Sequence, residues 1–181
     1  ERDELVLMVQ QQKTTNEELS AQKSTLTNEK DRLQAEKDAL AGKVNFASSI
    51  KVTDISAVGY KVKSSGKETD TKKAKTIDGI KVCFKTTVNE VTGNKKKKFY
   101  LRVIDPHGQV MAIQDLGSGS MKLGNSTETI QFTQSVDVDY KHEIAPGCIN
   151  WQPGIPFATG KYDVEIYNKG FMAGKASFEL K

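Results

Sequence analysis

The sequence is poor in the residues that most often crosslink a small fold or act in catalysis and metal binding. Its 181 residues include two cysteines, two histidines, one tryptophan and four prolines. Cys83 and Cys148 are too few for a disulfide framework, and neither lies in a spacing typical of zinc sites. We therefore expect two free thiols, with a single disulfide as the alternative if the protein is exported.

Sequence motifs for catalysis and for cofactor binding are also missing. His107 lies in a predicted turn without a nucleophile–base pair, and there is no Gly-x-Ser-x-Gly elbow. The densest acidic and histidine group is Asp137, Asp139, His142 and Glu143, whose spacing matches neither an EF-hand nor a zincin. The sequence therefore predicts a protein without enzymatic activity, cofactor or metal ion.

Long hydrophobic runs are absent as well. The longest run, from Leu5 to Val9, is far too short to cross a bilayer. The chain begins at Glu1 with neither an initiator methionine nor a signal-peptide pattern. We therefore expect a longer protein, attached to a membrane only through an anchor outside this sequence.

A seven-residue leucine repeat dominates the N-terminal part of the chain. Its positions are Leu5, Leu19, Leu26, Leu33 and Leu40, with Gln12 in the remaining place. A straight α-helix cannot keep such a repeat on one face, so the pattern predicts a supercoiled helix over residues 1–46. Gly42 is expected to end the helix, with Asn45 just beyond it.

If the leucines are the d positions of this predicted coiled coil, its second set of core positions, the a positions, is weakly hydrophobic. It contains Val9 and Asn16, followed by lysines whose aliphatic stems can lie along the seam. A buried asparagine at such a position fixes register in a two-stranded coil. We therefore predict a parallel homodimer through Leu5, Val9, Asn16 and the four leucines from Leu19 to Leu40. A trimer, and a single helix packed on its own domain, are the alternatives.

The hydrophobic period changes from 3.5 to 2 after Ala47, which is typical of strands. The predicted strands are 50–62, 80–88, 99–104, 110–113, 130–138, 162–166 and 176–180, of which 99–104 is a nearly continuous apolar run. No helical pattern interrupts them. Residues 47–181 are therefore predicted to form an antiparallel β-sandwich of about seven strands.

The final segments resemble the last hairpin of an immunoglobulin-like domain. They run from Gly160 to Tyr167 and from Gly174 to Leu180. The resemblance implies that Tyr162 forms a tyrosine corner, with its hydroxyl bonded to backbone upstream. Val164 stands where antibody domains have a cysteine, so the resemblance does not pair Cys83. The order of coil and sandwich also resembles envelope-anchored proteins of Bacteroidetes, which implies a periplasmic or surface location.

The segment from Pro146 to Phe157 holds the only tryptophan and three of the four prolines. It is predicted to be a long connection outside the regular strands. Trp151, Ile155 and Phe157 either present a surface to a glycan or protein partner, or close one end of the core. We favour the second interpretation.

Basic residues are concentrated between residues 51 and 98, which contain thirteen lysines, no arginine and five acidic residues. Lys95, Lys96, Lys97 and Lys98 follow a predicted hairpin tip. They either form a face for an anionic polymer or lipid headgroups, or keep a strand edge solvated. The absence of arginine and of interleaved aromatic residues argues against nucleic acid.

These patterns favour a homo-oligomeric cell-envelope scaffold or adhesion-type module, in which a coiled-coil stalk presents a β-sandwich binding domain. Two other functions remain open. One is a carbohydrate-binding sandwich that uses the Trp151 loop, and the other is an intracellular coiled-coil adaptor.

Overall fold

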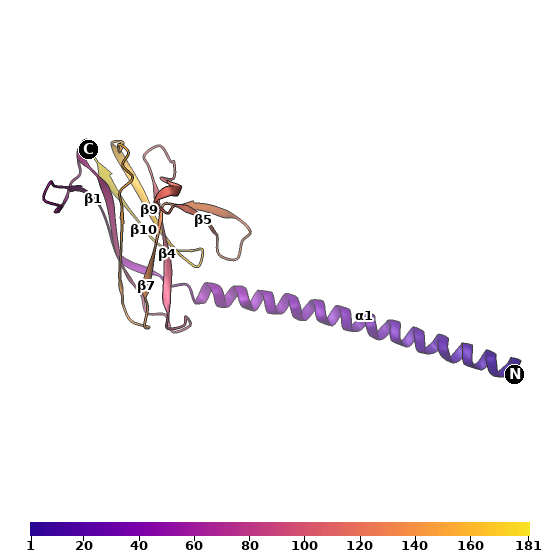
Figure 1. Cartoon of the computed structure of the whole chain (residues 1–181). Coiled ribbons are helices and arrows are strands. Elements are labelled where there is room, and N and C mark those ends of the chain that lie inside the picture. The colour runs from indigo at the N-terminus through magenta and orange to yellow at the C-terminus, as the bar shows by residue number, and fades with distance from the viewer. The chain divides into compact units, whose positions relative to one another are not determined.

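The computed structural model describes residues 1–181 and divides the chain into two compact units, residues 1–43 and 44–181. One helix, α1 (Arg2–Ala47), accounts for the first unit and leads into the second (Figure 1). The second unit consists of antiparallel β-sheets. None of the helices combines the length and the hydrophobicity that a membrane span requires.

The expectation of one long N-terminal helix is confirmed, but its predicted end at Gly42 is wrong. The helix continues to Ala47, and the amide of Ser48 still donates to the carbonyl of Val44 at 2.9 Å. A single interior glycine costs only about 1 kcal/mol relative to alanine. Phe46, one turn beyond Gly42, packs edge-on against Phe171 at 5.3 Å, and this contact holds the last turn in helical form.

Residues 44–181 contain ten strands, more than the seven expected. The strands are β1 (Val52–Val62), β2 (Glu68–Asp70), β3 (Gly79–Thr86), β4 (Lys96–Ile104), β5 (Gly119–Lys122), β6 (Thr129–Phe132), β7 (Gln134–Asp139), β8 (Pro146–Trp151), β9 (Gly160–Asn168) and β10 (Phe171–Leu180). Two short 3-10 helices, η1 (Ala74–Thr76) and η2 (Gln114–Leu116), lie in the connections.

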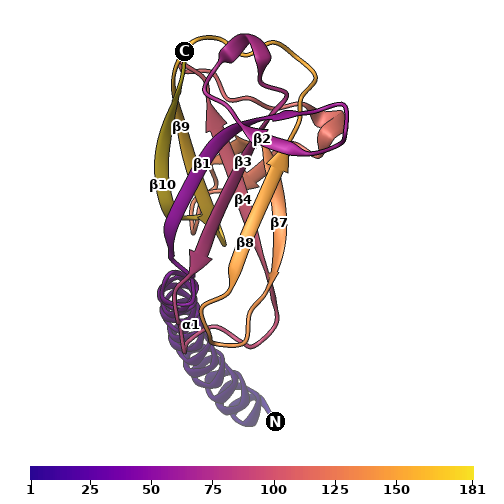
Figure 2. The ribbon, with the colours of Figure 1, turned by 90° about the vertical axis from the view of Figure 1, so that its left-hand side faces the viewer.

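The strands form two four-stranded sheets and one hairpin. The first sheet has the order β2-β1-β3-β8 and the second has the order β10-β9-β4-β7. Figure 2 looks onto the first sheet, with the strands of the second sheet behind it. Strands β5 and β6 pair only with each other. Each pairing is antiparallel, as the alternating pattern predicts.

One hydrophobic core joins the two larger sheets. The first sheet contributes Val82, Phe84 and Trp151, and the second contributes Phe99 and Ile166. All five side chains are almost fully buried. The inward positions of both sheets therefore face each other, as they do in a β-sandwich.

Two predicted strands differ in the structure. The expected strand 110–113 is reduced to a single bridge between Ile104 and Val110. The expected strand 130–138 breaks at Thr133 into β6 and β7. Thr133 leaves the hairpin there, donates its amide to the carbonyl of Leu101 at 2.7 Å, and accepts the amide of Val103 on its hydroxyl at 2.9 Å. A side chain that replaces ladder bonds in this way is invisible to a period-2 pattern.

The predicted tyrosine corner is confirmed. The hydroxyl of Tyr162 donates to the carbonyl of Ala158 at 2.9 Å, four residues upstream. The Tyr162 ring stacks on Phe178 with centroids 5.1 Å apart and meets Phe157 at 6.3 Å. The corner thus ties the connection that follows β8 to the hairpin formed by β9 and β10.

Candidate functional site

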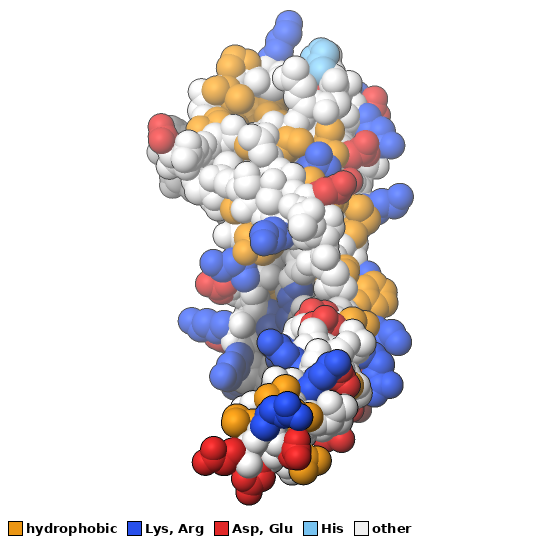
Figure 3. Space-filling model, turned by 90° about the vertical axis from the view of Figure 1, so that its right-hand side faces the viewer, with side chains coloured by type: hydrophobic (Ala, Val, Ile, Leu, Met, Phe, Trp, Pro, Cys, Tyr) orange, Lys and Arg blue, Asp and Glu red, His pale blue; other side chains and the backbone are white.

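The leucine repeat of α1 is exposed along its whole length. No residue of the helix is buried, and the five leucines are 51–66% exposed. Asn16 and Val9 are exposed in the same way. Figure 3 shows hydrophobic side chains at the surface in small groups between acidic and basic ones. A stripe of this kind is a surface that self-association would cover.

The segment predicted as a connection contains a strand, so that prediction is wrong. Residues 146–151 form β8, in which Ile149 and Trp151 point into the core while Cys148 and Asn150 point outward. Gly147 also faces inward and leaves room for the ring of Phe84. Proline is compatible with the first position of a strand. Only one aliphatic residue marks the inward face, so the alternation was too short to detect.

The burial of Trp151 decides between the two interpretations of this segment. Trp151 is 1% exposed, and Phe157 is also buried, so neither can contribute to a partner surface. They close the core, as the favoured interpretation expected. Ile155, at 47% exposure, is the one member of the predicted set that remains accessible.

The cysteines are bonded to each other, so the expectation of two free thiols is wrong. Cys83 on β3 and Cys148 on β8 form a disulfide. Both lie on the outward face of the first sheet, Cys83 between the inward-facing Val82 and Phe84. They occupy directly opposed positions in the β3–β8 ladder. The sequence could not reveal this pairing, because β8 itself was not recognised.

The predicted lysine surface lies on β4, which is an internal strand and not a sheet edge. Lys96 and Lys98 point outward and stand opposite Asp139 and Asp137 of β7. Lys97 points toward the interior at the end of the sheet. Burial lowers the pKa of Lys97, and the nearby charges of Lys169 and Lys95 lower it further.

The acidic and histidine group does not converge. Asp137 and Asp139 lie on the outer face beside the lysines of β4. His142 places Nε2 2.7 Å from the carbonyl of Thr92. No three acidic, histidine or cysteine side chains come together at a position where they could hold a metal ion.

A groove between β1 and β10 was not predicted. It has a volume of about 570 Å³ and is lined by Ala57, Val58, Gly59, Asp70, Thr71, Lys72 and residues 177–181. Strand β10 forms the edge of the second sheet, and β1 pairs with β2 only from Tyr60 onward. The groove therefore lies between two strand segments that have no neighbouring strand on the side that faces it.

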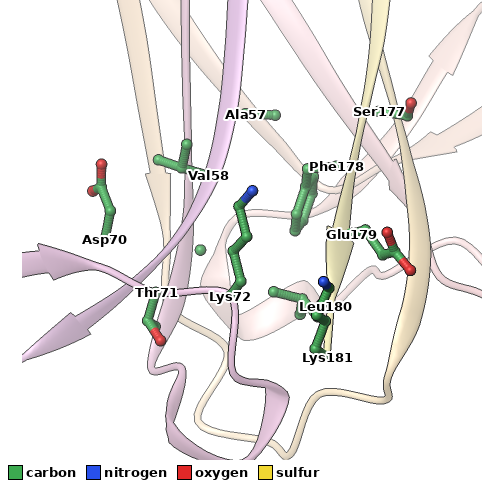
Figure 4. A pocket seen from close by; sticks show the side chains of 11 residues that line it. Ala57, Val58, Asp70, Thr71, Lys72, Ser177, Phe178, Glu179, Leu180 and Lys181 are labelled. Atoms are coloured by element: carbon green, nitrogen blue, oxygen red, sulfur yellow. The ribbon is translucent and has the colours of Figure 1, made fainter.

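The walls of the groove combine hydrophobic and basic side chains. Phe178, half-buried, and Ala57 pack against the core. Figure 4 shows Lys72 and Phe178 between the two walls, with the carboxylates of Asp70 and Glu179 turned to the outer sides. These residues are far apart in the sequence and belong to different sheets. No local motif marks such a site, and only the pairing order of the strands brings it together.

The sequence of the second unit matches a known family. Residues 53–181 match the family described as "Domain of unknown function (DUF8428)". The chain belongs to this family. The match begins one residue into β1 and covers the rest of the β unit, so the family is defined by the sheets and not by α1. No curated protein matches the chain.

Solved structures resemble the chain only distantly. An immunoglobulin-like protein from Pseudomonas aeruginosa is 12% identical over 73% of this chain and 96% of that one, with a TM-score of 0.35. The archaeal flagellum of Methanospirillum hungatei is 12% identical over 86% and 78%, with a TM-score of 0.41. An alkylpurine DNA glycosylase of Pseudomonas fluorescens is 12% identical over 73% and 30%, with a TM-score of 0.31. The DUF8428 domain is a sandwich of two antiparallel sheets around one core, and these distant likenesses add nothing about its fold or its activity.

Proposed function

We propose that the protein is a non-enzymatic, homo-oligomeric module of the cell envelope, a scaffold or adhesion-type protein. In this proposal α1 self-associates as a parallel coiled coil and the DUF8428 domain is the binding part. The observation that carries the proposal is the exposed seven-residue repeat of leucines, on a helix of 46 residues that has no buried side chain. Association would remove those side chains from water, at about 25 cal/mol for each Å² of apolar surface.

The disulfide supports the location outside the cytoplasm. Disulfides form and persist in oxidising compartments and are rare where thiols are kept reduced. The Cys83–Cys148 bond is exposed on its Cys148 side and would be open to reductants. The disulfide therefore favours a protein of the periplasm or the cell surface over an intracellular adaptor.

The test is the mass of the full chain by analytical ultracentrifugation. We expect twice the chain mass of 20.0 kDa. The double variant Leu26→Asp with Leu33→Asp puts charges into the seam and should give monomers. The control, Asn28→Asp with Ala35→Asp, adds two acidic residues on the opposite face of the same turns and should remain dimeric. A monomeric wild type, or a dimer that resists the Leu26 and Leu33 changes, would overturn the proposal.

A further inference from the structure

The groove between β1 and β10 already contains a short extended segment of this chain. Thr71 donates its amide to the carbonyl of Gly59 on β1 at 2.8 Å. One residue later, the carbonyl of Lys72 accepts the amide of Lys181 at 2.6 Å, and the amide of Ala74 donates to the carbonyl of Lys181 at 2.9 Å. Main-chain hydrogen bonds of residues 71–74 therefore reach the edges of both sheets.

The rest of the β10 edge offers main-chain amides and carbonyls to the groove, with no strand beside it on that side. In an antiparallel strand, the amide and carbonyl of residues two apart point to the same side. Since those of Lys181 point to the groove, those of Glu179 and Ser177 do as well. Strand β10 pairs only with β9, so this row faces the groove without a paired strand. An unpaired row of this kind is a template for strand addition.

The side chains along the groove define what would fit beside this edge. Phe178 and Ala57 provide apolar surface between the strands. Lys72 and Lys181 stand at the end closed by residues 71–74, and neither ammonium takes part in an ion pair. The two carboxylates that line the groove turn away from its centre in Figure 4. Asp70 and Glu179 equal the two lysines in number, so positive charge predominates only toward the centre of the groove, where the carboxylates do not point.

We propose that this groove binds an extended, acidic segment of a partner protein, which adds as a strand along Ser177 and Glu179 of β10. The main-chain bonds of β10 hold the segment, Phe178 contacts its apolar side chains, and Lys72 and Lys181 pair with its carboxylates. The volume of about 570 Å³ suits a few residues of extended chain. The site does not depend on α1, so it stands whether or not the helix self-associates.

The probe is an acetylated and amidated octapeptide of alternating valine and glutamate, labelled with fluorescein. Its binding to the full chain is followed by fluorescence anisotropy, and its position by hydrogen exchange with mass spectrometry. We expect saturable binding, with added protection confined to residues 57–59 and 175–181. The same peptide with lysine in place of glutamate should bind about tenfold more weakly or not at all, because it meets Lys72 and Lys181 with like charge.

Two variants with matched controls test the two parts of the site. Ser177→Pro removes an amide that faces the groove and should abolish binding, whereas Ser177→Thr keeps the amide and should not. Lys72→Glu should weaken binding of the acidic peptide about tenfold, since it removes a charge-assisted hydrogen bond. Lys75→Glu makes the same change on η1, outside the groove, and should bind as the wild type does.

Four results would overturn the proposal. They are the absence of saturable binding, equal binding of the lysine peptide, protection elsewhere on the chain, and indifference to Lys72→Glu. Lys72 is exposed, so this variant remains informative if Ser177→Pro unfolds the domain. A fall in the mass of the unliganded chain on Ser177→Pro would show that a second copy occupies the groove, and would refute the partner assignment.

Discussion

Cys83 on β3 stands directly opposite Cys148 on β8, with their Cα atoms 4.1 Å apart. This separation is typical of the close, non-hydrogen-bonded pairs of an antiparallel ladder. The disulfide therefore links the edge strand β8 to its only neighbour in the sheet. Strand β8 places Trp151 in the core, so the disulfide fixes the strand whose tryptophan closes the core.

Removal of this disulfide should destabilise the domain. The double change Cys83→Ser with Cys148→Ser releases a loop with a sequence separation of 65 residues, and we expect a loss of about 2–4 kcal/mol in the free energy of unfolding. Urea unfolding of the oxidised protein and of the variant measures the difference. Titration should find no reactive thiol in the native protein and two after reduction. A native protein with two reactive thiols would refute the bond.

Replacing Trp151 and Ile155 in turn compares a core residue with a surface residue of the same segment. Trp151→Ala removes a fully buried ring and should cost about 3–5 kcal/mol in the free energy of unfolding. Ile155→Ala, four residues on, changes an exposed side chain and should stay within about 0.5 kcal/mol. Urea unfolding followed by circular dichroism compares both with the wild type. Similar costs for the two changes would contradict the placement of Trp151.

The tyrosine corner can be tested by the loss of one oxygen. Tyr162→Phe keeps the stacked ring but removes the bond to the carbonyl of Ala158, and we expect a loss of about 1–2 kcal/mol. Tyr100→Phe is the control, because Tyr100 contacts Phe132 through its ring alone. Thermal unfolding should show a lower Tm for the first variant only. If both variants melt alike, the hydroxyl of Tyr162 does not stabilise the fold.

Lys97 should give the domain a pH-dependent and salt-dependent stability. Its pKa is lowered by burial and by Lys169 and Lys95, so the folded state disfavours its charge. The penalty is present below the folded pKa and disappears as the pH rises through that value toward the ordinary pKa of lysine, about 10.4. Lys97→Met should therefore stabilise the protein at neutral pH and low salt.

This advantage should shrink with added salt and at alkaline pH, because both reduce the repulsion among the three lysines. Lys96→Met is the control, since Lys96 points outward opposite Asp139 and its removal should not stabilise the domain. Urea unfolding at pH 7 and pH 10 measures both variants. A gain that is independent of pH would show that packing of the methionine, and not lost repulsion, is its cause.

Asn16 is expected to select the number of strands in the proposed coiled coil. Asn16→Leu should strengthen association, because leucine buries more apolar surface, but it should loosen the choice of oligomer. Sedimentation equilibrium of the full chain should then show a mixture of dimers and larger species. A variant that remains a pure dimer would count against Asn16 as the residue that fixes the register.

Much of the architecture follows from local pattern. The leucine repeat predicts a long helix and the alternation from Val52 onward predicts strands, because both periods record which face of an element is buried. The corner at Tyr162 was also predictable, since its hydroxyl bonds only four residues upstream. The helix end was misjudged because the contact of Phe46 with Phe171, a residue far away in the sequence, outweighs the local signal of Gly42.

The sequence by itself determined the period of each element, the turn between β9 and β10, and the absence of familiar catalytic motifs. Only the tertiary structure decided which strands are neighbours. That order set Cys83 opposite Cys148, buried Trp151, and opened the groove between β1 and the edge of β10. The physical reason is that strand pairing and sheet packing join residues more than sixty positions apart. The energies of strand pairing and sheet packing depend on the register of all the strands, and a short stretch of sequence does not contain that information.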